Sequence, residues 1–148
     1  MSQDVDVAAE GVRVPLARSR VADLARAVLE AEGVADASLS IAFLRPSAIA
    51  AINRKHLDHR GPTDVISFPL AAAGGAPLGG DIYICPDVAS RNALAHGVGL
   101  REEIARLVVH GVLHVLGHEH PEGAGRERSA MWRRQEALLA NFEELWRA

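Results

Sequence analysis

The sequence predicts a single α+β domain in which a small mixed β-sheet of about four strands is covered by about five helices. The 148 residues suit one domain with a core of its own, and no linker-like stretch divides residues 1–148. Segments with strand-like alternation lie early and in the middle of the chain, while segments with helical periods lie between them and at the end. This mixed order is typical of one sheet layered with helices.

The first part of the chain begins with alternating apolar residues at 5–7 and 12–14, which predict a first strand or a hairpin. Residues 16–31 follow a helical period that ends at Gly33. Residues 39–43 alternate again and predict a half-buried strand.

A second helix is predicted to open at Pro46, and its apolar and polar side chains separate into two groups. The inward group is Ile49, Ile52 and Leu57, and the group facing solvent or a cleft is Asn53, Arg54 and Lys55.

The middle of the chain contains two further predicted strands and a short helix. Residues 63–69 form a short strand that Pro69 is expected to close. Residues 79–85 are continuous enough in apolar character to be a central strand, in which the single Cys85 serves packing. Pro86 then begins a short helix that ends before Gly97.

Two long helices are predicted in the last third. The first starts at residues 101–103, where acidic side chains favour a helix N-terminus, and carries the histidines described below. The final amphipathic helix has the inner stripe Met131, Leu138, Phe142 and Leu145, flanked by Trp132 and Trp146, which are expected in the core.

Composition limits the function classes. No apolar run approaches the roughly 18 residues of a membrane span, and the acidic start lacks a signal core. One cysteine rules out an internal disulfide and fits a reducing cytoplasm. The net charge of −3 gives no support to nucleic-acid binding through bulk electrostatics, although a local basic patch is compatible with it.

Four of the seven histidines lie within residues 110–120. His110 and His114 are the only polar side chains in an apolar helical run from Leu107 to Leu116. An unpartnered buried polar group costs about 1–3 kcal/mol, so two imidazoles in such a run need partners. Because residues four apart share a helix face, the pair can bind one metal ion together.

A third ligand is predicted to follow this helix, and two histidines compete for the role. Gly117, with Pro121 soon after it, predicts that the helix stops there. A reversal at Gly117 would return His120 over the first two histidines, whereas one further helical turn would place His118 on the face of His114. Geometry leaves the choice open, although the glycine favours His120. Three imidazoles leave one position of a tetrahedral Zn²⁺ open to water, as in catalytic sites.

The spacing also matches the protease pattern H-E-x-x-H-x-x-G-x-x-H, with one difference. Gly111 stands where those proteases carry the glutamate that acts as general base. Because glycine cannot accept a proton, the sequence predicts the metal site without the peptide-cleaving chemistry.

Several segments together resemble the bacterial YbeY family. Residues 110–120 resemble its H-G-x-L-H-L-x-G-x-D-H signature, and residues 63–69 resemble its T-D-V-x-S-F-P segment. Residues 80–84 match its G-D-I-x-I strand, residues 52–53 match its L-N helix end, and Met131 follows at the expected distance.

This resemblance covers the chain from about residue 41 onwards and implies a zinc-dependent, single-strand-specific endoribonuclease with one Zn²⁺ per chain. It also implies a role in 16S rRNA 3′-end maturation and in ribosome quality control. The implied partners are single-stranded and ribosomal RNA, the small ribosomal subunit and its assembly proteins in the cytoplasm, with no membrane. His110, His114 and His120 are then the zinc ligands, which decides between His120 and His118.

Two positions depart from the family pattern. Glu119 replaces the usual aspartate and keeps a carboxylate. Leu57 replaces an arginine that is thought to contact RNA phosphate in the family. The candidates for binding substrate in its place are Asn53, Arg54 and Arg60, with Lys55 as a further cation.

Glu119 and Asp64 are the candidates for the general base or for a role in orienting metal ligands. A turn cap is the competing interpretation of Asp64, and a solvated carboxylate is that of Glu119. Two other functions also remain open. One is a different metal-dependent hydrolase, such as a peptidase or amidase, and the other is a non-catalytic ribosome-assembly factor in which zinc holds the C-terminal half.

Overall fold

The computed structural model describes residues 3–70, 78–119 and 129–147, and within them it shows the predicted α+β architecture. The strands are β1 (Gln3–Ala9), β2 (Ala37–Phe43), β3 (Val65–Leu70) and β4 (Leu78–Ile84). The helices are α1 (Arg18–Ala31), α2 (Pro46–Leu57), α3 (Pro86–His96), α4 (Leu100–Val115) and α5 (Ala130–Asn141), and the short 3₁₀ helix η2 (Glu143–Leu145) follows them.

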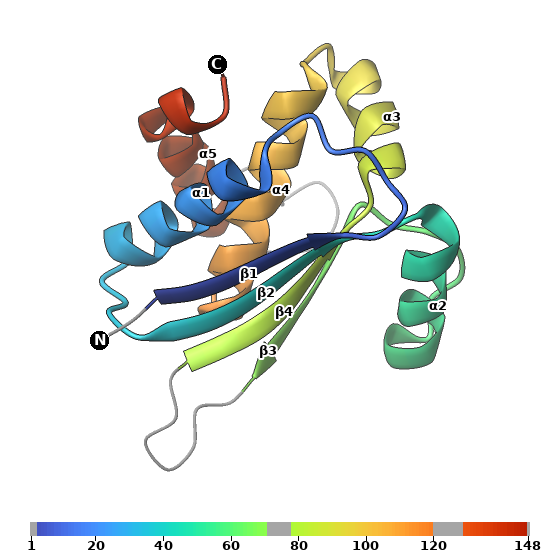
Figure 1. The fold of residues 1–148 in the computed structure, drawn as a ribbon, viewed down its shortest axis with the longest axis horizontal. Helices are drawn as coiled ribbons and strands as arrows, with labels where there is room; N and C mark the ends of the chain where they lie inside the picture. The colour runs from blue at the N-terminus through green and yellow to red at the C-terminus, as the bar shows by residue number, and fades with distance from the viewer. Residues whose placement is uncertain (1–2, 71–77, 120–128, 148) are drawn as a thin grey trace.

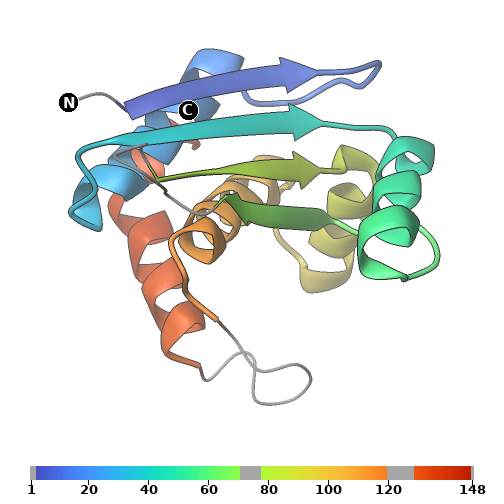
Figure 2. The same ribbon diagram turned by 90° about the horizontal axis from the view of Figure 1, so that it is seen from below.

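The four strands form one mixed sheet in the order β1-β2-β4-β3. β1 is parallel to β2 and β2 is parallel to β4, whereas β3 is antiparallel to β4. β4 therefore lies inside the sheet, as its apolar sequence predicted. Helices α1, α4 and α5 lie on one side of the sheet, and α2 lies beyond the ends of the strands (Figures 1 and 2).

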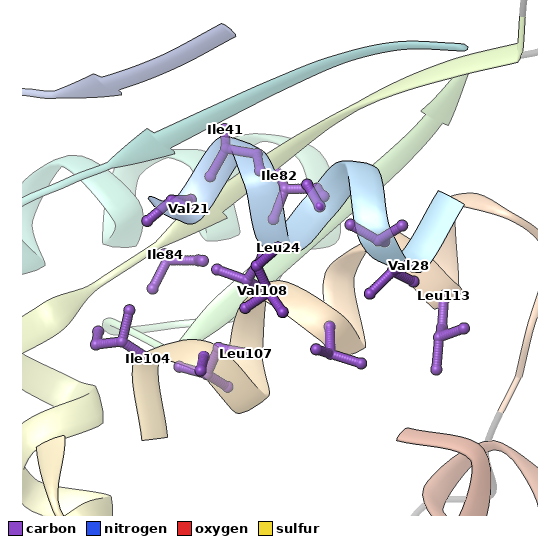
Figure 3. Packing of buried hydrophobic residues seen from close by; sticks show 14 of the residues in the cluster. Val21, Leu24, Val28, Ile41, Ile82, Ile84, Ile104, Leu107, Val108 and Leu113 are labelled. Carbon is purple, nitrogen blue, oxygen red and sulfur yellow. The ribbon is translucent and has the colours of Figure 1, made fainter. Parts of the chain in front are cut away.

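The main core lies between the sheet and helices α1 and α4 (Figure 3). Helix α1 contributes Val21, Leu24 and Val28, which are fully buried against this layer. Ile41 and Ile82 come from neighbouring strands, where they pair in register on the helix side of the sheet. Burying an aliphatic side chain of this kind contributes roughly 1.5–3 kcal/mol, so this layer fixes the position of α4.

Glycines bring α4 unusually close to β4. A Cβ atom at Gly111 would lie 2.7 Å from Cγ2 of Ile82, and a Cβ atom at Gly80 would lie 2.7 Å from Cγ2 of Val115. Real Cβ atoms do not approach so closely, so both positions need glycine at this separation. Position 111 consequently faces the sheet.

The structure decides one strand prediction between its two alternatives and corrects another. Residues 12–14 form no strand, so the N-terminal segment is a single strand that pairs in parallel with β2 rather than a hairpin. Pro69 does not close β3, because the strand continues through it to Leu70. β3 lies at the edge of the sheet, where a residue without an N–H is tolerated.

The structure also corrects the expected orientation of side chains on α2. Leu57 was expected to face inward but is 44% exposed. Asn53 was expected to face solvent or a cleft but is buried, with 5% exposed. The final helix stops at Asn141, before the short η2. Cys85 is buried and free, in agreement with a packing role. Among the described residues, no helix combines the length and apolar character needed to cross a bilayer.

Candidate functional site

The two predicted ligands on α4 lie side by side. Their ring centroids are 6.4 Å apart with an interplanar angle of 32°, His110 is only 7% exposed, and His114 is half-buried. The four-residue spacing therefore places both imidazoles on one helix face, as expected. His120, the third predicted ligand, lies outside the described residues.

The turn after α4 is a glycine-based helix stop. Gly117 has a φ of +101°, a region that side chains disfavour. Its N–H donates to the carbonyl of His114 at 3.0 Å, and the N–H of His118 donates to the carbonyl of Leu113 at 3.0 Å. These two bonds form a Schellman motif, which reverses the chain at the point that the sequence predicted.

His118, the rival ligand, contacts a carboxylate at the end of α1. Its Nε2 lies 2.8 Å from Oε1 of Glu32, just after α1, and Arg134 donates to the other oxygen of that carboxylate at 2.8 Å. This triad links the turn after α4 to both α1 and α5.

His110 contacts a buried polar side chain on α5. Its Nδ1 lies 2.7 Å from Oε1 of Gln135, and Nε2 of Gln135 donates to Glu136 at 3.1 Å. Gln135 is 1% exposed, so nearly all of its surface is enclosed by protein.

Arg106 binds Glu136, the last residue in the series of hydrogen bonds that starts at His110. Its guanidinium donates to Glu102, Glu103 and Glu136, with four bonds of 2.9–3.1 Å. Burial lowers the pKa of Arg106, but the hydrogen bonds and charges of these carboxylates outweigh that effect and raise its pKa above the ordinary value. Arg106 is therefore a fixed cation that is already committed to three anions.

A cleft of about 380 Å³ is lined by His110, the first histidine of the pair. Asp64 lines it and is held in place: one carboxylate oxygen accepts the N–H of Val65 at 2.8 Å, and the other accepts the amide of Asn92 at 3.2 Å. Asp64 is thus both the local cap that its position predicted and part of the cleft wall. Other lining residues are His96, Arg106, His110 and Trp132.

The comparisons with known proteins agree on one family. The sequence profile of the family described as Endoribonuclease YbeY matches residues 6–143. This chain belongs to the YbeY family. A YbeY endoribonuclease of Thermobifida fusca is 38% identical over 147 residues, which cover 93% of each chain. One from an Anaeromyxobacter species is 39% identical over 142 residues, which cover 95% of this chain and 72% of the relative. A solution structure from Thermotoga maritima superposes with a TM-score of 0.62 at 24% identity, covering 96% of this chain and 89% of the other, and supports the fold.

The other predicted site residues of this YbeY-family chain lie on α2, in the loop after it and after the glycine turn. Asn53 is buried and donates to the carbonyl of Gly61 at 3.0 Å, so its amide braces the loop after α2. Arg54 and Arg60 are exposed on that helix and loop, and Glu119 is exposed after the glycine turn.

Sequence reasoning missed three side chains around the site. Trp132 was expected in the core but is half-exposed and lines the cleft, whereas Trp146 is buried as expected. Gln135 and Arg106 carried no pattern that pointed to the histidines. The one signal for Arg106 was its spacing from Glu102 on the same helix, which is typical of any solvated helix face.

Proposed function

We propose that this chain is a zinc-dependent endoribonuclease that cleaves single-stranded RNA. The observation that carries the proposal is the adjacent His110–His114 pair, of which His110 lines the cleft, in a chain of the YbeY endoribonuclease family. Two imidazoles on one helix face are suitable ligands for Zn²⁺, which binds nitrogen and tolerates an open fourth position. When bound, zinc supplies a water of pKa about 7 and polarises a phosphoryl oxygen.

His120 is the proposed third ligand. The turn at Gly117 supports it, because the chain reverses immediately before residues 118–120. The contact between His118 and Glu32 also supports it, because that contact occupies the ring of the competing histidine.

Asp64 is our preferred candidate for the residue that moves or orients a proton. Its carboxylate lines the cleft and is fixed by Val65 and Asn92, so it can accept a proton from a water or hydroxyl at a defined place. Glu119 is the second candidate, since it directly precedes His120 in the chain.

The charged side chains in and around the cleft indicate where the phosphates and the bases of RNA would bind. Arg106 is committed to three carboxylates, so it does not attract phosphate into the cleft. Exposed Arg54, Lys55 and Arg60 are the proposed phosphate contacts outside it, in place of the family arginine that Leu57 replaces. A base inside the cleft would meet the aromatic side chain of Trp132.

Trp132→Ala is expected to weaken binding of single-stranded RNA, because stacking on an aromatic ring contributes roughly 1–3 kcal/mol per base. This corresponds to a rise in Kd of roughly 5- to 150-fold, measured by fluorescence anisotropy with a short labelled oligonucleotide. Trp132→Phe, which keeps an aromatic face, should retain most of the affinity. Equal losses in the two variants would contradict a stacking role.

Removing the metal is expected to stop RNA cleavage without unfolding the sheet, because apolar side chains form the core between the sheet, α1 and α4. The measurement is cleavage of a single-stranded oligonucleotide after dialysis against a chelator and again after one equivalent of Zn²⁺ is added. Activity that survives chelation would contradict the proposal.

The cellular substrate proposed for this activity is the 3′ end of 16S rRNA on the small ribosomal subunit, with a role in ribosome quality control and with assembly proteins as partners. Sequencing of rRNA ends in cells that lack the protein tests this assignment. Unprocessed 3′ ends are the expected result, and normal ends would contradict it.

A further inference from the structure

The histidine pair is connected to a line of polar side chains that runs from α4 to α5 and back. Nδ1 of His110 lies 2.7 Å from Oε1 of Gln135, and Nε2 of Gln135 donates to Glu136 at 3.1 Å. Glu136 accepts two bonds from Arg106, at 3.0 and 3.1 Å. Each member of the line therefore touches the next one within hydrogen-bond distance.

The direction of each bond follows from the charged end of this line. The guanidinium of Arg106 has only donors and stays charged in proteins. Glu136 accepts from it through both oxygens, and a carboxylate is acceptor-only when it is ionised. The NH₂ group of Gln135 must then face Glu136, because the reversed amide would place its oxygen against the carboxylate. Its Oε1 is left to face the histidine.

We propose that Gln135 is a positioning residue that fixes His110 as the tautomer with the proton on Nδ1. An amide oxygen can only accept a hydrogen bond, so Nδ1 of His110 must donate the proton. In a neutral imidazole this puts the lone pair on Nε2, the nitrogen that would bind a metal ion. Glu136 and Arg106 set the direction of the amide and therefore act on His110 through Gln135.

The burial of the line makes the tautomer preference strong. Gln135 is 1% exposed, so water does not readily replace either of its partners. A His110 ring protonated on Nε2 would bring two acceptors, Nδ1 and the amide oxygen, to within 2.7 Å of each other. The role of this tautomer in binding zinc rests on the proposed metal site. The tautomer itself follows from the hydrogen bonds and is expected in the metal-free protein as well.

The tautomer is measured directly in metal-free protein by long-range ¹H–¹⁵N correlation spectra of the histidine rings, recorded at a pH where His110 is neutral. The wild-type ring is expected to carry its proton on Nδ1. Gln135→Leu removes the acceptor at similar size and should shift His110 toward the other tautomer. A wild-type proton on Nε2, or a tautomer that is unchanged in Gln135→Leu, would overturn the proposal.

Zinc affinity provides the second readout, by titration of metal-free protein against a chromophoric chelator. Gln135→Leu is expected to weaken zinc binding by about 10–100-fold, the usual effect of removing a group that orients a metal ligand. Gln135→Met removes the amide oxygen while keeping the length of the side chain, and it should give the same shift of tautomer and the same loss of affinity. It therefore covers the case in which Gln135→Leu fails to fold.

Leu138→Ala is the matched control, because Leu138 is equally buried on α5 and carries no polar group. It should lower stability without changing zinc affinity or the His110 tautomer. Equal loss of zinc affinity in Leu138→Ala and Gln135→Leu would show a merely structural role and overturn the proposal. A protein with the predicted tautomer and normal zinc binding that leaves RNA intact would contradict the proposed nuclease function alone.

Discussion

His114→Ala is expected to abolish cleavage of single-stranded RNA while the fold is retained. The substitution removes one of two adjacent imidazoles, and His114 is only half-buried, so the cavity left behind costs little stability. A catalytic metal contributes several kcal/mol to the transition state, which corresponds to a loss in rate of roughly a thousandfold or more. The measurement is kcat/KM on a single-stranded oligonucleotide, together with the zinc content of the same sample.

His118→Ala is the matched control for this experiment. It removes a histidine four residues after His114 in the chain. The ring of His118 contacts Glu32, so we do not expect it to bind the metal. This variant should keep its zinc and its cleavage activity and lose only part of the contact between the turn and α1. If instead it loses zinc as fully as His114→Ala does, His118 rather than His120 is the third ligand.

A cleavage-dead variant that still binds zinc separates the nuclease from a non-catalytic assembly factor. Asp64→Asn is that variant, because it changes the proposed proton-handling residue and none of the proposed zinc ligands. Cells that produce only Asp64→Asn should retain the rRNA processing defect if cleavage is the function. Rescue of that defect by a zinc-loaded, cleavage-dead protein would contradict the nuclease proposal.

Gly111→Glu, which restores the glutamate of the protease pattern, is expected to destabilise the protein rather than to create a peptidase. A Cβ atom at this position would lie 2.7 Å from Cγ2 of Ile82, so α4 would have to move away from β4. Overpacking of this kind costs about 1–3 kcal/mol, and a carboxylate buried against the sheet adds to that cost. Urea denaturation should show the loss, and a peptide library should show no turnover.

Two variants test whether this close contact is the cause. Gly99→Ala adds the same methyl group just before α4, where nothing lies within 4 Å, and should leave stability nearly unchanged. Ile82→Ala removes the side chain that the new Cβ meets, so the cost of Gly111→Ala should fall in that background. Equal destabilisation by Gly111→Ala in both backgrounds would argue against the packing explanation.

Local chemistry was enough to predict the helix that carries His110 and His114, and where it ends. The spacing of His110 and His114 fixes them on one face, and Gly117 with Pro121 marks the stop that the left-handed φ confirms. The apolar run of β4 likewise indicated its central place in the sheet. In these elements the local pattern and the tertiary structure agree.

Features that depend on distant partners were not predictable in the same way. Gln135 becomes relevant only because α5 packs against α4 and brings it to His110, 25 residues away in sequence. Trp132 has the apolar character of a core residue, and only the arrangement of α3, α4 and α5 leaves it beside the cleft. Asn53 reads as a surface residue of α2 until the following loop folds back onto its amide.

X-ray absorption spectroscopy at the zinc edge of the loaded protein tests the central claim most directly, because it reports the atoms bound to the metal. The expected first shell has three imidazole nitrogens at about 2.0–2.1 Å and one light oxygen atom from water. The spectrum of each of His110→Ala, His114→Ala and His120→Ala should show one imidazole fewer bound to zinc. This result would assign each histidine as a ligand. A fourth protein ligand that closes the shell, or a shell that these substitutions leave unchanged, would contradict the account.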